Sequence, residues 1–144
     1  MASIHASAVL VGPRAVLIRG PSGSGKSALV HALLDAARGG VIPFARLVAD
    51  DRVILSVHHG RLLARAPDVL AGLAERRGAG LVRRPHEARA VIGWVIDLDA
   101  PDAARMPDEA AASVAVEGVI LPRIPVAVGL PPLPLVLEAI GRSG

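Results

Sequence analysis

An eight-residue motif near the N-terminus constrains the fold of this 144-residue chain more than any other feature. Residues 20–27 read Gly-Pro-Ser-Gly-Ser-Gly-Lys-Ser and match the P-loop pattern G-x-x-x-x-G-K-[ST]. The glycines of such a loop let successive backbone N–H groups surround phosphate oxygens, and the following helix points its positive end at them. The motif therefore requires a strand directly before it and a helix directly after it.

The residues on both sides of the motif have the required patterns. Residues 15–18 form the apolar run Ala-Val-Leu-Ile, which is typical of a buried strand, and residues 27–38 repeat apolar residues at helical spacing. Gly39-Gly40 ends that pattern. This order favours a true P-loop over a glycine-rich turn, so we predict nucleotide-phosphate binding by Gly20, Pro21, Ser22, Gly23, Ser24, Gly25, Lys26 and Ser27.

Lys26 and Ser27 carry the chemistry of the motif. Lys26 is the only lysine of the chain, beside 15 arginines, and its flexible stem suits the reach to the β- and γ-phosphates. The Ser27 hydroxyl is the predicted ligand of a Mg²⁺ ion, which keeps water and phosphate oxygens as most of its other ligands.

Composition narrows the class of protein. The chain is 52% hydrophobic, but the charge-free stretch at residues 124–137 contains four prolines and is too short to span a membrane. The N-terminus lacks a signal-peptide pattern and the chain has no cysteine, so we expect a cytoplasmic protein without disulfides. The net charge of +3, the dispersed arginines and the 1% aromatic content give no sign of nucleic-acid binding.

Strands are expected to outnumber helices. Apolar runs predict strands at residues 7–11, 15–19, 46–49, 53–57, 61–64, 90–98, 114–120 and 124–128, with hairpin turns at Gly12-Pro13 and at residues 58–60. Besides the P-loop helix, helices are predicted to start at Pro67 and to cover residues 133–140. We therefore expect an α/β protein with a P-loop-containing mixed sheet and flanking helices, in one domain covering residues 1–144.

Two adjacent acids, Asp50 and Asp51, follow the predicted strand at residues 46–49. Acids at such a strand end in P-loop proteins can hold magnesium directly or through water. Neighbouring residues point in different directions, so one aspartate can serve the metal while the other accepts a proton from an incoming hydroxyl. The alternative is a solvated loop start paired with Arg52.

Several segments, taken in order, resemble the catalytic domain of HPr kinase/phosphorylase. They are His5, the P-loop, Leu-Val-Ala-Asp-Asp-Arg at residues 47–52, Ala66-Pro67, and Glu-Arg-Arg-Gly-Ala-Gly-Leu at residues 75–81. The last is similar to the family signature E-[VI]-R-G-L-G-I, from which it departs at Arg76 and Ala79. The resemblance implies a fold of the HPr kinase / phosphoenolpyruvate carboxykinase type.

The resemblance also implies an activity and a set of site residues. The family uses ATP and Mg²⁺ to phosphorylate a serine of the phosphocarrier HPr in the phosphotransferase system, and it forms hexamers. Asp51 matches its general base, and the other matching catalytic positions are Lys26, His5 and Arg105. Arg105 is also readable as a surface residue between Asp102 and Asp108. The implied metal ligands are Ser27 and Glu75, and the strand-end argument adds Asp50.

Two departures from the family affect the expected activity. The family has an Arg-Asn pair after a C-terminal glycine, in a segment tied to dephosphorylation, whereas Leu130-Pro131-Pro132 follows Gly129 here. From the position of His5 we also expect the family's N-terminal domain to be absent. We therefore expect a short-form serine kinase whose phosphorylase activity is in doubt. The alternatives are a small-molecule P-loop kinase and a non-catalytic module that senses a nucleotide.

Overall fold

The computed structural model describes residues 2–103 and 112–143. The strands along the chain are β1 (Ser7–Val11), β2 (Arg14–Arg19), β3 (Ala45–Ala49), β4 (Ile54–His58), β5 (Arg61–Arg65), β6 (Leu73–Arg76), β7 (Gly80–Arg83), β8 (Ala90–Asp97), β9 (Ser113–Val116) and β10 (Val119–Pro125). The helices are α1 (Lys26–Arg38) and α2 (Pro132–Ser143). The predicted mixed α/β architecture is confirmed.

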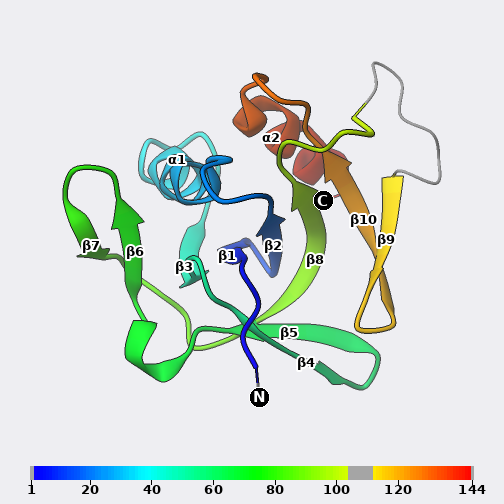
Figure 1. Ribbon diagram of the computed structural model, residues 1–144, viewed down its shortest axis with the longest axis horizontal. Coiled ribbons are helices and arrows are strands. Elements are labelled where there is room, and N and C mark those ends of the chain that lie inside the picture. Colours follow the sequence, from blue (N-terminus) through cyan, green and yellow to red (C-terminus); the bar gives the residue numbers. More distant parts are fainter. Residues whose placement is uncertain (1, 104–111, 144) are drawn as a thin grey trace.

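The main sheet has the strand order β3-β1-β2-β8-β10-β9. Strands β2, β8 and β10 are parallel to one another, while β1 pairs antiparallel with both β2 and β3. Strand β3 therefore runs in the same direction as β2, and both end at the same edge of the sheet. The β4–β5 hairpin joins this sheet through β5, which pairs with β8, and β6–β7 form a separate two-stranded sheet (Figure 1).

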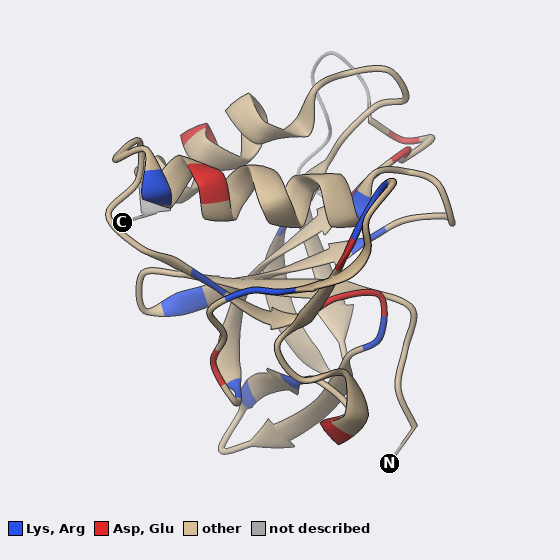
Figure 2. Cartoon of the chain, turned by 90° about the vertical axis from the view of Figure 1, so that its left-hand side faces the viewer, with Lys and Arg blue, Asp and Glu red and all other residues tan. Residues whose placement is uncertain are grey.

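Apolar residues are buried on both faces of the main sheet. Val16, Ile18 and Ile96 pack with Leu29 and Leu33 of α1, in a cluster that also includes residues of α2. Their neighbours in the strands point the other way, into a second cluster with residues of β4–β5, β9 and β10. Figure 2 shows both helices on one side of the sheet. The central strands β2 and β8 are thus buried on both faces, which explains their continuous apolar runs.

Two-residue turns close the hairpins β1–β2, β4–β5 and β9–β10, whereas three residues join β6 to β7. Gly12, with φ 67°, is the first of the two residues that join β1 to β2, as the sequence predicts. The predicted strand at residues 114–120 is wrong, because Glu117 and Gly118 both have positive φ and form a tight turn between β9 and β10. Consequently β10 begins at Val119 and ends at Pro125, earlier than predicted.

The helix predicted to start at Pro67 is also wrong. Only Asp68–Leu70 form a 3-10 turn, and the chain then enters β6. The apolar spacing in this segment does not mark a buried helix face, since Val69 is 84% exposed. Gly72, with φ 77°, redirects the chain into the strand. The helix predicted at residues 133–140 is confirmed as α2. None of the helices in the described residues is long and apolar enough to cross a membrane.

Candidate active site

The predicted site residues meet at one edge of the main sheet. The P-loop follows β2, and Asp50-Asp51 follow β3, so the shared direction of these strands brings the two segments to the same edge. Strand β1 runs in the opposite direction and starts there, which adds His5 and Ser7. Loops at the carboxyl ends of parallel strands are where α/β sheets bind ligands.

The P-loop is a tight turn that leaves little room for a side chain at its first position. A Cβ atom on Gly20 would lie 2.5 Å from Ser24 Oγ and 3.0 Å from Leu98 Cβ. Lys26 is buried, and its Nζ donates hydrogen bonds to the carbonyls of Gly20 (2.9 Å) and Pro21 (3.1 Å). The ammonium has three donors, so a third is left for a phosphate oxygen.

Asp50 is the buried centre of a hydrogen-bond network. The residue is 5% exposed. Its carboxylate accepts hydrogen bonds from Ser7 Oγ (2.7 Å), Ser27 Oγ (2.9 and 3.0 Å) and the backbone N–H of Glu75 (2.7 Å). A buried carboxylate with this many donors is well satisfied. Because the Ser27 hydroxyl donates its hydrogen bond to Asp50, its oxygen lone pairs are free to bind a cation.

Asp51 points the other way, into solvent. Its side chain is 48% exposed and its Oδ1 lies 3.2 Å from Nδ1 of His5, which is 47% exposed. Asp51 has φ 67°, a conformation that aspartate tolerates better than most residues. The backbone N–H of Asp51 donates to Ser7 Oγ at 3.0 Å, so one serine holds both aspartates.

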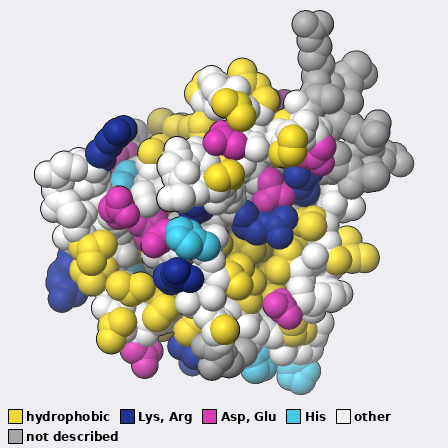
Figure 3. Space-filling model, viewed as in Figure 1, with side chains coloured by type: hydrophobic (Ala, Val, Ile, Leu, Met, Phe, Trp, Pro, Cys, Tyr) yellow, Lys and Arg dark blue, Asp and Glu magenta, His cyan; other side chains and the backbone are white. Residues whose placement is uncertain are grey.

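A single open pocket of about 580 Å³ joins these parts. Its walls include Gly23, Lys26 and Ser27 of the P-loop together with His5, Asp51 and Glu75. Glu75 comes from β6, and the exposed side chains of Arg76 and Arg77 add positive charge to the rim. On the face seen in Figure 3, acidic, basic and histidine side chains gather near its centre. Except for Arg105, every predicted catalytic or metal-binding residue lies in this pocket or bonds to one that does.

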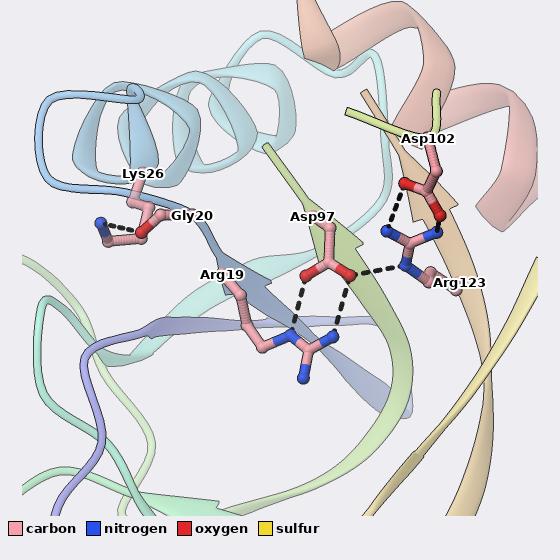
Figure 4. A network of polar contacts seen from close by, with 6 residues as sticks. All are labelled: Arg19, Gly20, Lys26, Asp97, Asp102 and Arg123. Carbon is pink, nitrogen blue, oxygen red and sulfur yellow. Dashed lines mark hydrogen bonds and ion pairs between the residues drawn. The ribbon is translucent and has the colours of Figure 1, made fainter. Parts of the chain in front are cut away.

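An ion-pair network that the sequence patterns did not reveal lies beside the P-loop (Figure 4). Asp97, at the end of β8, accepts bonds from Arg19 Nε (2.7 Å) and Nη2 (2.8 Å) and from Arg123 Nε (2.6 Å). Arg123 also binds Asp102 through two bonds of 2.9 Å. A charged residue at the end of a buried strand needs an oppositely charged partner. The signal in the sequence was therefore a charged residue at the end of an apolar run, as at Arg19 and Asp97.

The charges of this network shift its pKa values. Burial alone would raise the pKa of Asp97, but hydrogen bonds from Arg19 and Arg123 outweigh it and hold the pKa below its usual value. The bond from Arg123 likewise lowers the pKa of the Asp102 carboxyl, and the carboxylate of Asp102 raises the pKa of Arg123. All three residues are therefore charged at neutral pH.

The network fixes Arg19, the residue that directly precedes the P-loop. Arg19 directly precedes Gly20, and its carbonyl accepts a bond from the N–H of Leu98 (2.8 Å), the residue that follows Asp97. Asp97 thus fixes the Arg19 side chain while the next residue fixes its backbone. Arg105, which was predicted to be catalytic, lies outside the described residues.

The fold has a close counterpart of known structure. No protein-family model matches this chain, and no curated protein matches its sequence. A structure described as the Hpr(Ser) kinase/phosphatase from Coxiella burnetii is similar over 99% of this chain and 95% of its own, with a TM-score of 0.76 and 25% identity. This chain has the HPr(Ser) kinase/phosphatase fold. The predicted fold type and the resemblance are therefore confirmed.

This HPr(Ser) kinase/phosphatase fold places the P-loop, Asp51 and Glu75 around one pocket although they are up to 55 residues apart in the chain. Residues that act on them through hydrogen bonds were not predicted, among them Ser7, His31 and Arg84. These residues carry no motif, and only the folded geometry identifies them.

Proposed function

We propose that this protein is a kinase that uses ATP and Mg²⁺ to phosphorylate a serine of an HPr-type phosphocarrier protein. The observation that carries the proposal is the single pocket in which the P-loop lysine and serine face the exposed Asp51–His5 pair. The similarity to the kinase/phosphatase fold supports a kinase-type enzyme. Phosphoryl transfer needs mainly positioning and neutralisation of charge, and the pocket offers groups for both.

The P-loop, Glu75 and Asp50 are the groups proposed to bind ATP and Mg²⁺. Backbone N–H groups of the P-loop hold the phosphates of ATP, and Lys26 binds the oxygens of its β- and γ-phosphates. Ser27 and Glu75 are the proposed protein ligands of Mg²⁺, and Asp50 orients the Ser27 hydroxyl toward it. When bound, the ion neutralises charge that develops on the phosphate oxygens.

Asp51 is the proposed general base. It accepts the proton of the carrier's serine hydroxyl while the serine oxygen attacks the γ-phosphorus and ADP leaves, and His5 holds its carboxylate in place. The exposure of Asp51 leaves it within reach of a serine on a protein surface. We propose the kinase direction because the turn before α2 presents Leu130, 54% exposed, and not a basic or amide side chain.

Replacing Asp51 by Asn tests this proposal. Asparagine tolerates the same left-handed backbone, so Asp51→Asn removes the base with little strain. We expect the rate of phosphoserine formation on a panel of HPr-type carriers to fall by about two to four orders of magnitude, with ADP affinity unchanged. Asp68→Asn, at a fully exposed aspartate, is the matched control and should keep the wild-type rate.

The outcome of the same assay separates the alternatives. Phosphoserine on a carrier that depends on Asp51 supports the proposal, and an unchanged rate in the Asp51→Asn variant refutes the role of this residue. ATP consumption with a small-molecule acceptor and no carrier would identify a small-molecule kinase. Nucleotide binding without any turnover would identify a sensing module.

A further inference from the structure

The β6–β7 hairpin carries Glu75 to the P-loop pocket, yet it is separate from the main sheet. An isolated two-stranded hairpin is marginally stable, so its position depends on contacts with the rest of the fold. Both backbone groups of Glu75 make such contacts. Its N–H donates to Asp50 Oδ2 at 2.7 Å, and its carbonyl lies 2.8 Å from Nε2 of His31.

The partners of His31 determine where its ring carries the proton. The Nδ1 atom lies 2.9 Å from Nη1 of Arg84, and a guanidinium can only donate. Nδ1 is therefore the acceptor, and Nε2 carries the hydrogen that it donates to the carbonyl of Glu75. Arg84 is itself held by Asp35 of α1, whose Oδ1 accepts from Nη2 at 3.1 Å.

His31 and Ser27 lie on the same face of α1. They are four residues apart, which places them one turn from each other on the helix, and both line the P-loop pocket. His31 is 8% exposed, so its bond to Glu75 is shielded from water. One face of α1 thus presents Ser27 and, one turn later, fixes the backbone of Glu75.

We propose that His31 is a positioning residue for the magnesium site: its Nε2–H, fixed by Arg84, holds the backbone of Glu75 at the pocket, where Glu75 and Ser27 would bind the same ion. This inference rests on the proposed function, in which Glu75 and Ser27 are the metal ligands. Groups that orient metal ligands through hydrogen bonds typically change metal affinity about 10- to 100-fold when they are removed.

The test compares the ADP affinity of each variant with and without Mg²⁺, measured by calorimetry. His31→Leu keeps most of the side-chain volume and removes both hydrogen bonds, whereas His31→Gln keeps a donor and an acceptor. We expect His31→Leu to lower the gain in ADP affinity that Mg²⁺ provides by about tenfold, with metal-free ADP affinity within about twofold of wild type. His31→Gln should restore most of the gain.

Glu75→Gln and the double variant separate this inference from the proposed function. If the inference is correct, Glu75→Gln also lowers the gain from Mg²⁺, and adding His31→Leu to it causes no further loss. If Glu75→Gln lowers the gain and His31→Leu does not, the positioning role is refuted while Glu75 remains a metal ligand. If neither lowers it, Glu75 is not a ligand, and both the metal assignment and this inference are wrong.

A spectroscopic measurement covers the case in which His31→Leu fails to fold. Nitrogen-15 NMR of the wild-type protein reports which ring nitrogen of His31 carries the proton. We expect protonation at Nε2 and not at Nδ1, and the Nε2–H resonance should shift when Mg²⁺ is added to the ADP complex. Protonation at Nδ1, or a resonance that does not respond to Mg²⁺, refutes the proposal.

Discussion

Asp97→Asn should lower the free energy of unfolding. Among substitutions that replace one charged side chain of the ion-pair network by a neutral one of the same shape, it should have the largest effect. Asp97 accepts three charge-assisted hydrogen bonds of 2.6 to 2.8 Å, and its side chain is only 13% exposed. The amide nitrogen of asparagine is a donor, so it would face guanidinium donors from Arg19 and Arg123. Both cations would lose their shared counter-charge.

The expected loss follows from these contacts. Breaking a buried ion pair by removing one partner costs about 3 to 5 kcal/mol. The lower end applies because Arg123 keeps its two bonds to Asp102 and Arg19 is 32% exposed, which lets water replace part of the lost interaction. We therefore expect a loss of about 3 kcal/mol in the free energy of unfolding, which lowers Tm by about 10 °C for a chain of this size.

Urea unfolding of wild type, Asp97→Asn and the control Asp102→Asn measures this loss. Asp102 makes the same kind of bond to Arg123 but is about half exposed, so its replacement should change stability much less. Equal effects of the two substitutions would refute the argument that burial of Asp97 sets the magnitude.

The pH dependence gives a second check. The pKa of Asp97 is lowered in the folded state, so its contribution is complete above the ordinary aspartate pKa of about 3.9 and is lost as the pH falls below that value. The difference between wild type and Asp97→Asn should therefore be constant from pH 5 to pH 7 and shrink below about pH 4. A difference that grows in acid contradicts the lowered pKa.

Two further predictions concern the P-loop and the direction of the reaction. Gly20→Ala should weaken ADP binding, because its Cβ would lie 3.0 Å from Leu98 Cβ and 3.2 Å from the Leu98 carbonyl oxygen. Gly141→Ala, with no atom near its added Cβ, should bind ADP as wild type does. Equal affinity of the two variants would show that the loop relaxes at no cost. When this protein is incubated with phosphoserine carrier and inorganic phosphate, it should release no more phosphate from serine than the buffer control does. The reason is that the segment at Leu130 lacks basic and amide groups. Phosphate-dependent release would show that other residues support the reverse reaction.

The sequence predicted the parts of the fold whose pattern is local. The β1–β2 hairpin, the P-loop, α1 and β8 each have a pattern that one segment specifies completely, and all are confirmed. The segment after Pro67 was assigned incorrectly because its strand is fixed by distant groups. Asp50 and His31 satisfy the free edge of β6, and neither is visible from the local spacing.

The same contrast between local patterns and distant contacts holds for the residues of the candidate site. The P-loop motif predicts Lys26 and Ser27, and the position of Asp51 after an apolar strand together with the family resemblance predicts Asp51. The contacts of Ser7 and Asp97 depend on which strands are neighbours: β1 starts where β3 ends, and Arg19 is the register partner of Asp97. A sequence without aligned relatives does not contain that order of strands.

The contrast between the two adjacent aspartates bears on the class of substrate. Asp50 is buried and accepts hydrogen bonds from Ser7, Ser27 and the backbone of Glu75, so it orients groups inside the site. Asp51 is about half exposed on an open pocket. A base that must work on a small molecule benefits from a site that closes and excludes water. A base for a serine on a folded protein must instead be reachable from outside, because the carrier's own surface covers it on docking. The position of Asp51 therefore favours a protein acceptor over a small one.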